Sequence, residues 1–575
     1  MSDQAGLRRV ARWEWIALAT ISALALLLRL WNLDALLPHL TESDGLVLAT
    51  QVDLLRSGAE HPERELLFGF YPHLVAWLAL LIPHAKIEAH TLAEQLALAA
   101  RSYGDPRMAV AIASVLIVPG TWALARRFLA PGAALLAAAF SATSLLHLWF
   151  AQQARPHAVS SALAVLAVVA ALRLFERGKA LDFLLGGLAA GLAIAALQSG
   201  IAVLLPLGLA LVLRRPEARA SSLLWLVPAL AIIALCVRVF YPFLFGPSQS
   251  ELGAGGGEFH LSGHVVYFDL FNGQGFMTVV RTLVDYDPWL TLCAVLGGAA
   301  LLARRTLTGR GRELAIVLAY AVPYFVMIAL YQRTYQRFVI PLVPYLACLA
   351  AWLVWTMARR VAQRIPLAPS AAMALFFAPQ AAPALRLLRV RAAPDTIEQA
   401  ARWIESSRDI APEHDRILVQ PSFDLPLPQS AAALEANVLM MDNRSRPWFR
   451  LQRSLPAEQR LLPAWNLIAM PLRTSEQMRA LNEDGPAYLR SLGADWFVIE
   501  VYSEGRTPLL LDQIPPALPA VAERVARFTP DHPDRGDDLP LLYQDDGYPR
   551  TEVWAWRLYH MHSLGPTIEI WRAKR

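Results

Sequence analysis

The sequence predicts a mostly α-helical protein, in which a polytopic bundle of about 11–13 transmembrane helices is followed by a small α/β domain. Of its 575 residues, 56% are hydrophobic and 17% are charged, whereas soluble proteins carry roughly 25% charged residues. The charge is also uneven, because residues 395–575 hold 20 of the 52 Lys and Arg and 26 of the 47 Asp and Glu. These values exclude a single soluble globule, a disordered chain and a fibrous repeat.

The uneven composition divides the chain into three parts. We expect residues 1–385 to form the transmembrane domain, with outer loops at 32–67 and 242–287. The basic segment 386–394 then forms a hinge, and residues 395–575 form a soluble domain outside the cytoplasm.

A membrane-spanning helix needs about 20 mostly apolar residues, and a series of segments approaches that length. The candidates are 14–31, 68–83, 106–125, 131–149, 157–174, 181–198, 200–213, 220–241, 288–303, 313–331, 337–357 and 366–385. The first follows three arginines but lacks a convincing small-residue cleavage site, so we expect an uncleaved anchor.

The orientation follows from short loops rich in Arg and Lys, which favour the cytoplasm. These loops are 126–127, 173–179, 214–219, 304–312 and 359–364. The positive charge of these loops, which lie between apolar segments, accounts for the basic pI of the chain. We therefore expect the partner to be a lipid bilayer and not nucleic acid. One crossing stays open: either the amphipathic stretch 88–101 crosses back, or 68–83 is re-entrant.

Residues after 395 alternate between helix-like and strand-like pieces. The segment 395–407 predicts a helix and 416–420 a strand, and a helix end at 488–493 precedes a second strand at 495–500. Short buried strands between helices are typical of a small α/β domain.

Two carboxylates stand in the first outer loop, which reads His-Leu-Thr-Glu-Ser-Asp-Gly over residues 39–45. Glu42 and Asp44 at the membrane surface suit a general base, or a metal if both converge. The alternative is an acidic residue at a helix start, where it accepts backbone N–H groups.

Three arginines lie on the predicted outer side, against the charge bias of the loops: Arg155, Arg333 and Arg337. An anionic partner explains such a placement, and the planar guanidinium binds phosphate oxygens in bidentate fashion. The alternative is an arginine that reaches to lipid headgroups at the outer surface.

The order of these motifs resembles the polytopic glycosyltransferases of the GT-C fold. The shared order is a first helix ending Arg-Leu-Trp-Asn-Leu, an acidic loop, Tyr-Pro-X-Leu at 71–74, an arginine-rich outer turn and Arg-Phe-X-X-Pro-X-X-Pro from 337. The resemblance runs over about 14–357 and is nearest to the protein O-mannosyltransferases and bacterial aminoarabinose transferases (glycosyltransferase family 39).

The resemblance implies a role for each candidate residue. It implies that Asp44 is the catalytic carboxylate, with Glu42 as the other candidate. Where the family has an Asp-Glu pair, this chain has Ser43-Asp44. Where the family has an outer Arg-X-Asp turn, this chain has Arg155-Pro-His157, with His in place of Asp. These departures weaken a metal site, so we expect no metal and no cofactor. The implied donor-binding residues are Tyr71, His73, Arg155, His157, Arg333 and Arg337.

The resemblance also implies the reaction. A sugar moves from a polyprenyl-phosphate-linked donor to an acceptor hydroxyl of a lipid, glycan or protein, with inversion and general-base assistance. The expected location is the outer face of a bacterial inner membrane. A transporter or flippase of lipid-linked saccharide is the alternative, but the sequence lacks the repeated halves typical of transporters.

Overall fold

The computed structural model describes residues 10–42, 45–60, 62, 68–83, 89–214, 216–242, 258–261, 264–304, 309–364, 369–420, 422–438, 446–472, 474–501, 514–531 and 553–574. Internal contacts divide the chain into two compact units. Unit 1 comprises Met1–Trp31, Gly58–Ala79 and Arg107–Leu385; unit 2 comprises Asn32–Ser57, Leu80–Pro106 and Arg386–Arg575.

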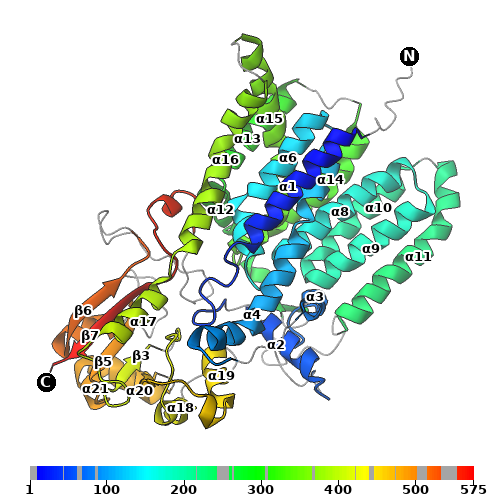
Figure 1. The fold of residues 1–575 in the computed structure, drawn as a ribbon. Coiled ribbons are helices and arrows are strands. Elements are labelled where there is room, and N and C mark those ends of the chain that lie inside the picture. Colours follow the sequence, from blue (N-terminus) through cyan, green and yellow to red (C-terminus); the bar gives the residue numbers. More distant parts are fainter. Residues whose placement is uncertain are drawn as a thin grey trace. The chain divides into compact units, whose positions relative to one another are not determined.

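Unit 1 is a bundle of helices with one small β-hairpin (Figure 1). Its helices are α1 (Arg12–Leu30), α3 (Leu74–Leu80), the end of α4 (Leu92–Ser114), α5 (Ile117–Ala125), α6 (Pro131–Thr143), α7 (Leu145–Ala151), α8 (His157–Glu176), α9 (Ala180–Ala196), α10 (Leu204–Leu213), α11 (Pro216–Phe240), α12 (Gly275–Tyr286), α13 (Pro288–Arg304), α14 (Gly311–Leu330), α15 (Val343–Arg364) and most of α16 (Pro369–Ala392). The hairpin pairs β1 (Glu258–Leu261) with β2 (His264–Tyr267), and the 3-10 helices η2 (Gln198–Val203) and η4 (Gln336–Leu342) precede α10 and α15.

Several helices of the described chain are long and apolar enough to cross a membrane. Six meet that condition, or up to eight if each of two bent helix pairs is one span, and three more apolar helices are shorter. This confirms a multi-pass, mostly helical protein.

Two predicted segments of the membrane part differ from the structure. Within 68–83 the helix α3 has seven residues, about 10 Å, which is too short to span a bilayer. The stretch 88–101 is not a separate helix, because α4 begins at Leu92 and continues without interruption past Pro106.

Glycines set the closest helix packing in unit 1. On α9, a Cβ atom at Gly187 would lie 2.6 Å from the Ala229 carbonyl oxygen, and one at Gly191 would lie 2.8 Å from the Cβ of Cys236. Both partners belong to α11, and Figure 1 shows α8–α11 side by side. Small residues at such positions let helix backbones approach closely.

Two bends in unit 1 are held together by one carboxylate. The pair α6–α7 bends by 52° at Ser144, and α12–α13 bends by 114° at Asp287. The Asp287 carboxylate accepts hydrogen bonds from Ser144 Oγ (2.6 Å), the Leu145 and Leu146 amides (2.9 and 3.3 Å) and Gln380 Nε2 (2.9 Å). It thereby caps the start of α7, the helix that leads into the turn at 152–157.

Unit 2 contains a five-stranded mixed sheet in the order β4 (Leu467–Ala469), β3 (Ile417–Val419), β5 (Trp496–Val501), β7 (Thr567–Ala573) and β6 (Ala522–Phe528). The β3–β4 and β3–β5 pairs are parallel, and β5–β7 and β6–β7 are antiparallel. The other helices of this part are α2 (Gly45–Ser57), α17 (Thr396–Ser406), α18 (Ala431–Ala436), α19 (Pro447–Ser454), α20 (Ser475–Glu483), α21 (Gly485–Ser491) and α22 (Ile514–Ala517).

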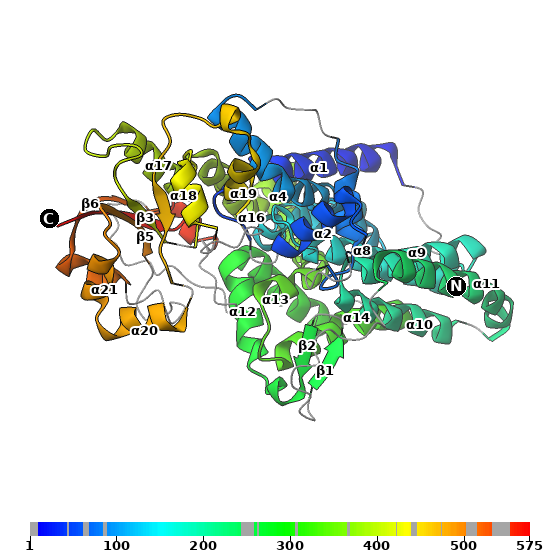
Figure 2. The same ribbon diagram turned by 90° about the horizontal axis from the view of Figure 1, so that it is seen from below.

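The alternation of side chains along the strands buries both faces of this sheet. On one face, Ile417 and Val498 pack with Ile397 of α17. On the other, Leu418 and Phe497 pack with residues of α20, α21 and α22. Figure 2 shows α17 and α20–α21 on opposite sides of the sheet. The predicted helix at 395–407 and the predicted strands at 416–420 and 495–500 are confirmed as α17, β3 and β5.

Unit 2 also includes residues 32–57 of the predicted first outer loop, and no pattern in these residues linked them to the C-terminal domain. His39 Nε2 lies 2.8 Å from Asp395 Oδ2, and the Asp424 amide donates to the His39 carbonyl at 2.9 Å. Asn32 and Arg391 exchange two hydrogen bonds, of 2.6 and 2.7 Å. The segment expected as a hinge, 386–394, is helical as far as Ala392, because α16 continues through it.

Candidate functional site

Three segments that are far apart in the sequence meet in unit 1 around the His157 ring. His157 begins α8 and is 3% exposed. Its ring stacks on Phe338 of η4, with centroids 5.6 Å apart at 27°, and meets the edge of the Tyr71 ring at 6.3 Å. The structure therefore brings the Tyr-Pro-X-Leu motif, the arginine-rich turn and the Arg-Phe-X-X-Pro motif into one aromatic group.

Arg337 belongs to the same group. Its side chain is largely buried (7% exposed), and its guanidinium carbon lies 4.3 Å from the Tyr335 ring centroid and 5.3 Å from that of Phe338. The face of an aromatic ring attracts a guanidinium that lies over it. The N–H groups of the guanidinium point outwards in the guanidinium plane and remain able to donate hydrogen bonds. Stacking of this kind fixes the orientation of the donor fork.

Arg155 lies two residues before His157 in the turn that joins α7 and α8. Its side chain is fully buried, and the guanidinium carbon lies 5.8 Å from the Phe150 ring centroid. A buried guanidinium is stable only where hydrogen bonds or an anion balance its charge. Arg155 therefore places a buried guanidinium in the interior of unit 1, two residues before the His157 ring.

His73 lies at the start of α3 and is buried, with Nε2 2.7 Å from the Phe68 carbonyl oxygen and its ring against that of Phe68. With Nε2–H donating to a carbonyl, the neutral ring presents Nδ1 as an acceptor. His73 can then donate to a phosphate only when it is protonated. This geometry makes it a weaker phosphate donor than the sequence suggested.

Arg333 lies apart from these contacts. Its side chain is exposed, and its guanidinium carbon lies 4.8 Å from the Tyr267 ring centroid on β2. Its described contact is therefore with the hairpin and not with the rings around His157.

The two predicted carboxylates belong to the segment that the sequence predicted as the first outer loop. Asp44 lies outside the described residues. Glu42 is 8% exposed and belongs to unit 2, and its backbone carbonyl accepts the Gly45 amide at 3.0 Å. A Cβ atom at Gly45 would lie 3.1 Å from Glu42 Oε2 and 3.2 Å from the Tyr103 ring, so Glu42 lies at the first turn of α2. That position fits the helix-start alternative as well as a general base.

Sequence reasoning missed two residues that build this part of unit 1. Phe338 was noted only as the second residue of the Arg-Phe-X-X-Pro-X-X-Pro motif. The distance between Phe338 and His157 along the sequence does not predict that their rings stack. Asp287 stands between two apolar segments, and a carboxylate in such a place signals a buried function. Its partners, Ser144 and Gln380, are more than 90 residues away on either side.

Among the described residues, no three His, Cys, Asp or Glu side chains converge as a metal site.

Comparison with known proteins gives one family match. The family model for dolichyl-phosphate-mannose-protein mannosyltransferases matches residues 93–244. That range includes Arg155 and His157. No curated protein sequence matches the chain.

Solved structures give likenesses at low identity. The oligosaccharyltransferase of Archaeoglobus fulgidus, in its apo form, is 13% identical with a TM-score of 0.45; 92% of this chain and 75% of that chain are covered. ArnT from Cupriavidus metallidurans bound to undecaprenyl phosphate is 14% identical with a TM-score of 0.43, covering 85% and 94%. The archaeal oligosaccharyltransferase AglB, solved with an inhibitory peptide and a dolichol-phosphate, is 13% identical with a TM-score of 0.42, covering 89% and 73%. The predicted resemblance to membrane glycosyltransferases is thus confirmed by the family match over residues 93–244.

Proposed function

We propose that the protein is an integral membrane glycosyltransferase that moves a sugar from a polyprenyl-phosphate-linked donor to an acceptor hydroxyl at the extracytoplasmic face of a bacterial inner membrane. The acceptor is a lipid, glycan or protein. The donor class is that of the matched family, whose description names a dolichyl-phosphate-linked mannose.

The observation that carries the proposal is the aromatic and cationic group of unit 1. Tyr71, His157 and Phe338 meet there, with Arg337 stacked on Phe338. Aromatic rings suit the apolar faces of sugars and prenyl chains, and a fixed guanidinium suits phosphate. A bundle with several apolar helices is also where a prenyl chain can lie.

In this proposal the lipid phosphate is the leaving group. Negative charge grows on its oxygens as the glycosidic bond breaks, and Arg337 and Arg155 stabilise that charge through oriented N–H groups. Donors fixed in advance require no reorganisation during the reaction, which makes this contribution large. The rings stacked on Arg337 hold its orientation.

Asp44 takes the proton from the acceptor hydroxyl while the oxygen attacks the anomeric carbon from the face opposite the phosphate. The anomeric configuration is therefore inverted. General-base assistance of this kind contributes about 10²–10⁴-fold. Glu42 is the second candidate for this role.

The experiment that tests the proposal is the Asp44→Asn variant in membranes that contain the native acceptor. Asn keeps the size of the side chain but cannot accept the proton, so transfer falls by about 10²-fold or more while donor binding persists. The measured quantity is polyprenyl phosphate released from a panel of labelled polyprenyl-phosphate sugars. A transporter or flippase would leave the sugar–phosphate bond intact, so it would release none.

Glu42→Gln is the matched control, two residues away with the same change of charge. A larger loss of transfer in Glu42→Gln than in Asp44→Asn would assign the base to Glu42. Full transfer in both variants would remove the general base from this loop, and loss of expression in Asp44→Asn alone would support the helix-start alternative.

A further inference from the structure

The first helix of unit 1 ends in a motif to which the proposed function gives no role. The motif is Arg-Leu-Trp-Asn-Leu, and its first residue, Arg29, lies in the last turn of α1 and is fully buried. Its Nη1 donates to the Ala25 carbonyl at 2.9 Å and, across to α6, to the Ala142 carbonyl at 3.4 Å. Its Nη2 lies 3.1 Å from His147 Nδ1 on α7. The end of α1 thus contacts both parts of the bent pair α6–α7.

The contact with His147 fixes the roles of both groups. A guanidinium has only donors, so Nδ1 of His147 accepts, and the neutral ring carries its proton on Nε2. His147 is fully buried in the first turn of α7. Arg29 therefore links α1 to α7 through one defined hydrogen bond.

A second contact joins the same two helices. Gln152 directly follows α7 and is fully buried. Its side-chain amide donates to backbone carbonyls at the end of α1, those of Leu28 at 2.9 Å, Arg29 at 3.3 Å and Trp31 at 3.3 Å. The last carbonyls of a helix have no partner within the helix, so Gln152 supplies hydrogen bonds that the end of α1 needs.

These contacts matter because α7 is short. It has seven residues, and a helix of that length is not stable in isolation, so its direction depends on contacts with other elements. Asp287 caps its start, and Arg29 and Gln152 join the rest of it to α1. The turn that follows contains Arg155 and His157. The end of α1 therefore helps to set where these two side chains lie.

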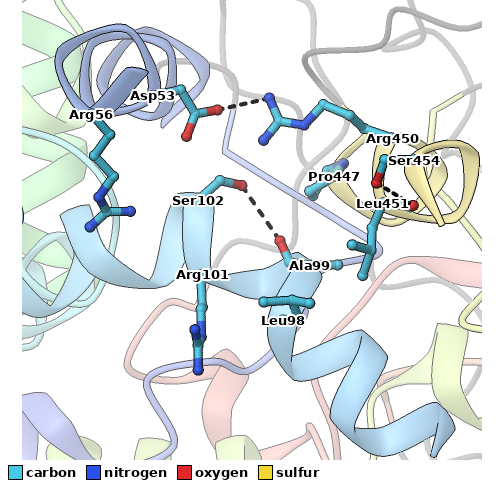
Figure 3. A pocket seen from close by; sticks show the side chains of 10 residues that line it. All are labelled: Asp53, Arg56, Leu98, Ala99, Arg101, Ser102, Pro447, Arg450, Leu451 and Ser454. Atoms are coloured by element: carbon cyan, nitrogen blue, oxygen red, sulfur yellow. Dashed lines mark hydrogen bonds and ion pairs between the residues drawn. The ribbon is translucent and has the colours of Figure 1, made fainter. Parts of the chain in front are cut away.

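The burial of Arg29 costs free energy. Its hydrogen bonds in the described part of the chain are with two carbonyls and a neutral imidazole. A buried charge without an opposite charge is costly, and well-packed apolar side chains are often as stable as buried charged groups. At the hollow of about 310 Å³ in unit 2, by contrast, Arg450 of α19 reaches Asp53 of α2 at 2.8 Å, and both side chains are partly exposed (Figure 3). A cation among apolar helices that neutral groups hold indicates a functional role.

We propose that Arg29, His147 and Gln152 form a brace between α1 and α7 that positions Arg155 and His157 for the phosphate of the donor. The three are positioning residues, because they act through the orientation of the turn after α7. Their role towards the donor rests on the proposed function, whereas the brace itself does not.

Two single variants test the brace, Arg29→Met and Gln152→Met. Each keeps an unbranched side chain and removes the hydrogen-bond donors. Full-length protein in phosphatidylcholine nanodiscs is measured first by hydrogen exchange. Amides of residues 152–157 should exchange about tenfold faster in both variants, the value of one lost hydrogen bond. Unchanged exchange at 152–157 in both variants would overturn the brace.

The second measurement is the release of polyprenyl phosphate from labelled polyprenyl-phosphate sugars, per folded molecule. At saturating donor the rate should fall by about tenfold or more in both variants, because a small displacement of a group that acts on the transition state lowers the rate strongly. The donor concentration that gives half the maximal rate should change less, since the lost interaction is strongest in the transition state. If the three residues only stabilised the fold, each folded molecule would keep its full rate, and the proposal would be overturned.

Variants of His147 provide the rescue. In His147→Asn the amide oxygen takes the place of Nδ1, so Arg29 keeps an acceptor, whereas His147→Leu removes it. We expect His147→Asn to retain most of the transfer rate and His147→Leu to lose about tenfold.

A double variant separates position from stability. Combining Arg29→Met with His147→Leu removes both partners of the hydrogen bond, so neither is left buried and unpaired. The unfolding temperature should then return towards that of the unchanged protein, while the transfer rate stays low. Recovery of transfer together with stability would make the brace a structural contact only and overturn the proposal.

Arg126→Met is the matched control, near the other end of α1. Arg126 directly follows α5 and pairs at 2.7 Å with Glu14 in the first turn of α1, and both side chains are largely buried. Glu14 lies fifteen residues before Arg29, roughly 22 Å along the helix. Exchange at 152–157 and the transfer rate should stay as in the unchanged protein. Losses equal to those of Arg29→Met would show a general effect of α1 packing and overturn the proposal.

Failure of the proposed function would give a different result. Neither the unchanged protein nor any variant would then release polyprenyl phosphate, while Arg29→Met and Gln152→Met still exchanged faster at 152–157. That result would leave the brace in place and refute the transfer reaction, and with it the role of the brace towards the donor.

Discussion

The two units stabilise their buried charges in different ways. In the interior of unit 1, Arg29 donates to the Ala25 carbonyl at 2.9 Å and to His147 Nδ1 at 3.1 Å, and Asp287 accepts the amides that begin α7. In unit 2, buried charges pair with opposite charges, as His39 does with Asp395 and Arg557 with Asp531. These examples of unit 1 use backbone groups and helix ends, and those of unit 2 use side-chain pairs, although the buried Arg391 of unit 2 also donates to the Asn32 and Leu33 carbonyls.

The difference follows from the surroundings. A charge among apolar helices has few side-chain partners, and the polar groups nearest to it are the backbone groups that a helix bend or end leaves unpaired. The ion pair Glu14–Arg126 of unit 1 lies at the start of α1 and the end of α5, again at helix ends. Removing a charge should therefore disturb helix geometry in unit 1 but only a local contact in unit 2.

The largest effect is expected for Asp287 in unit 1. Asp287→Ala leaves the Ser144 hydroxyl, two amides and the Gln380 amide without their acceptor, at about 1–3 kcal/mol for each buried group. We expect the free energy of unfolding to fall by about 3 kcal/mol or more, measured by thermal unfolding in detergent. Asp287→Asn should destabilise nearly as much, because its NH₂ group faces donors.

The control for this change lies two residues earlier. Asp285→Asn removes the same charge from a half-buried position on α12, and it should change the stability by less than about 0.5 kcal/mol. Equal effects at 285 and 287 would mean that charge in this region, and not the capping of α7, stabilises the bend.

The next effect concerns activity and the cationic group of unit 1. Arg337→Ala should lower the release of polyprenyl phosphate by about 10²-fold, as the loss of one oriented donor to a developing oxyanion does. Arg337→Lys should be intermediate, since it keeps the charge without the planar fork. Arg333→Ala is the control, because its exposed guanidinium contacts the hairpin. If Arg333→Ala caused the larger loss, the surface near β2 and not the rings around His157 would bind the donor.

The sequence predicted what depends on composition and on local pattern. The apolar segments, the helix at 395–407 and the strands at 416–420 and 495–500 follow from hydropathy and periodicity, and the structure has them. The sequence also singled out Tyr71, His157 and Arg337. The order of motifs along a chain can be compared with that of a known family without knowing which residues are close in space.

Contacts between distant segments could not be predicted in this way. The hydrogen bond between His39 and Asp395 joins residues that are 356 positions apart in the sequence. Nothing in the sequence around either residue identifies the other as its partner. The same holds for Asp287 with Ser144, which lie 143 positions apart. Helix length was also misjudged, because hydropathy does not show that α3 ends at Leu80 or that α4 tolerates Pro106.

A smaller effect is expected in unit 2 from Asp395→Asn. Asp395 both caps α17, through the Ile397 and Glu398 amides, and pairs with His39. Asn is a good N-cap residue, so this change removes the charge of the pair and keeps the cap. We expect a loss of about 1–2 kcal/mol, seen as faster hydrogen exchange in α17. Asp395→Ala should cost about 1 kcal/mol more, because it also removes the cap; equal losses would show that the cap contributes nothing.

The smallest effect is the dependence of this pair on pH. Burial lowers the pKa of His39, but the charge and hydrogen bond of Asp395, together with the nearby Glu398 and Asp424, outweigh it, so that the pKa is raised above its ordinary value of 6.5. For Asp395, burial raises the pKa, and the charge and hydrogen bond of His39 with the two α17 amides lower it below its ordinary value of 3.8. A base whose pKa is raised by folding stabilises the fold fully below the pKa of the unfolded state, and this contribution is lost as the pH rises through the pKa of the folded state. An acid whose pKa is lowered by folding contributes above its ordinary pKa, and this contribution is lost only at lower pH. Protection of α17 from exchange should therefore be greatest between about pH 4 and 6.5 and should decrease above it. In His39→Gln and in Asp395→Asn, both of which keep Asp424, this decrease in protection should be absent. If the decrease persisted in both variants, it would come from the titration of another group.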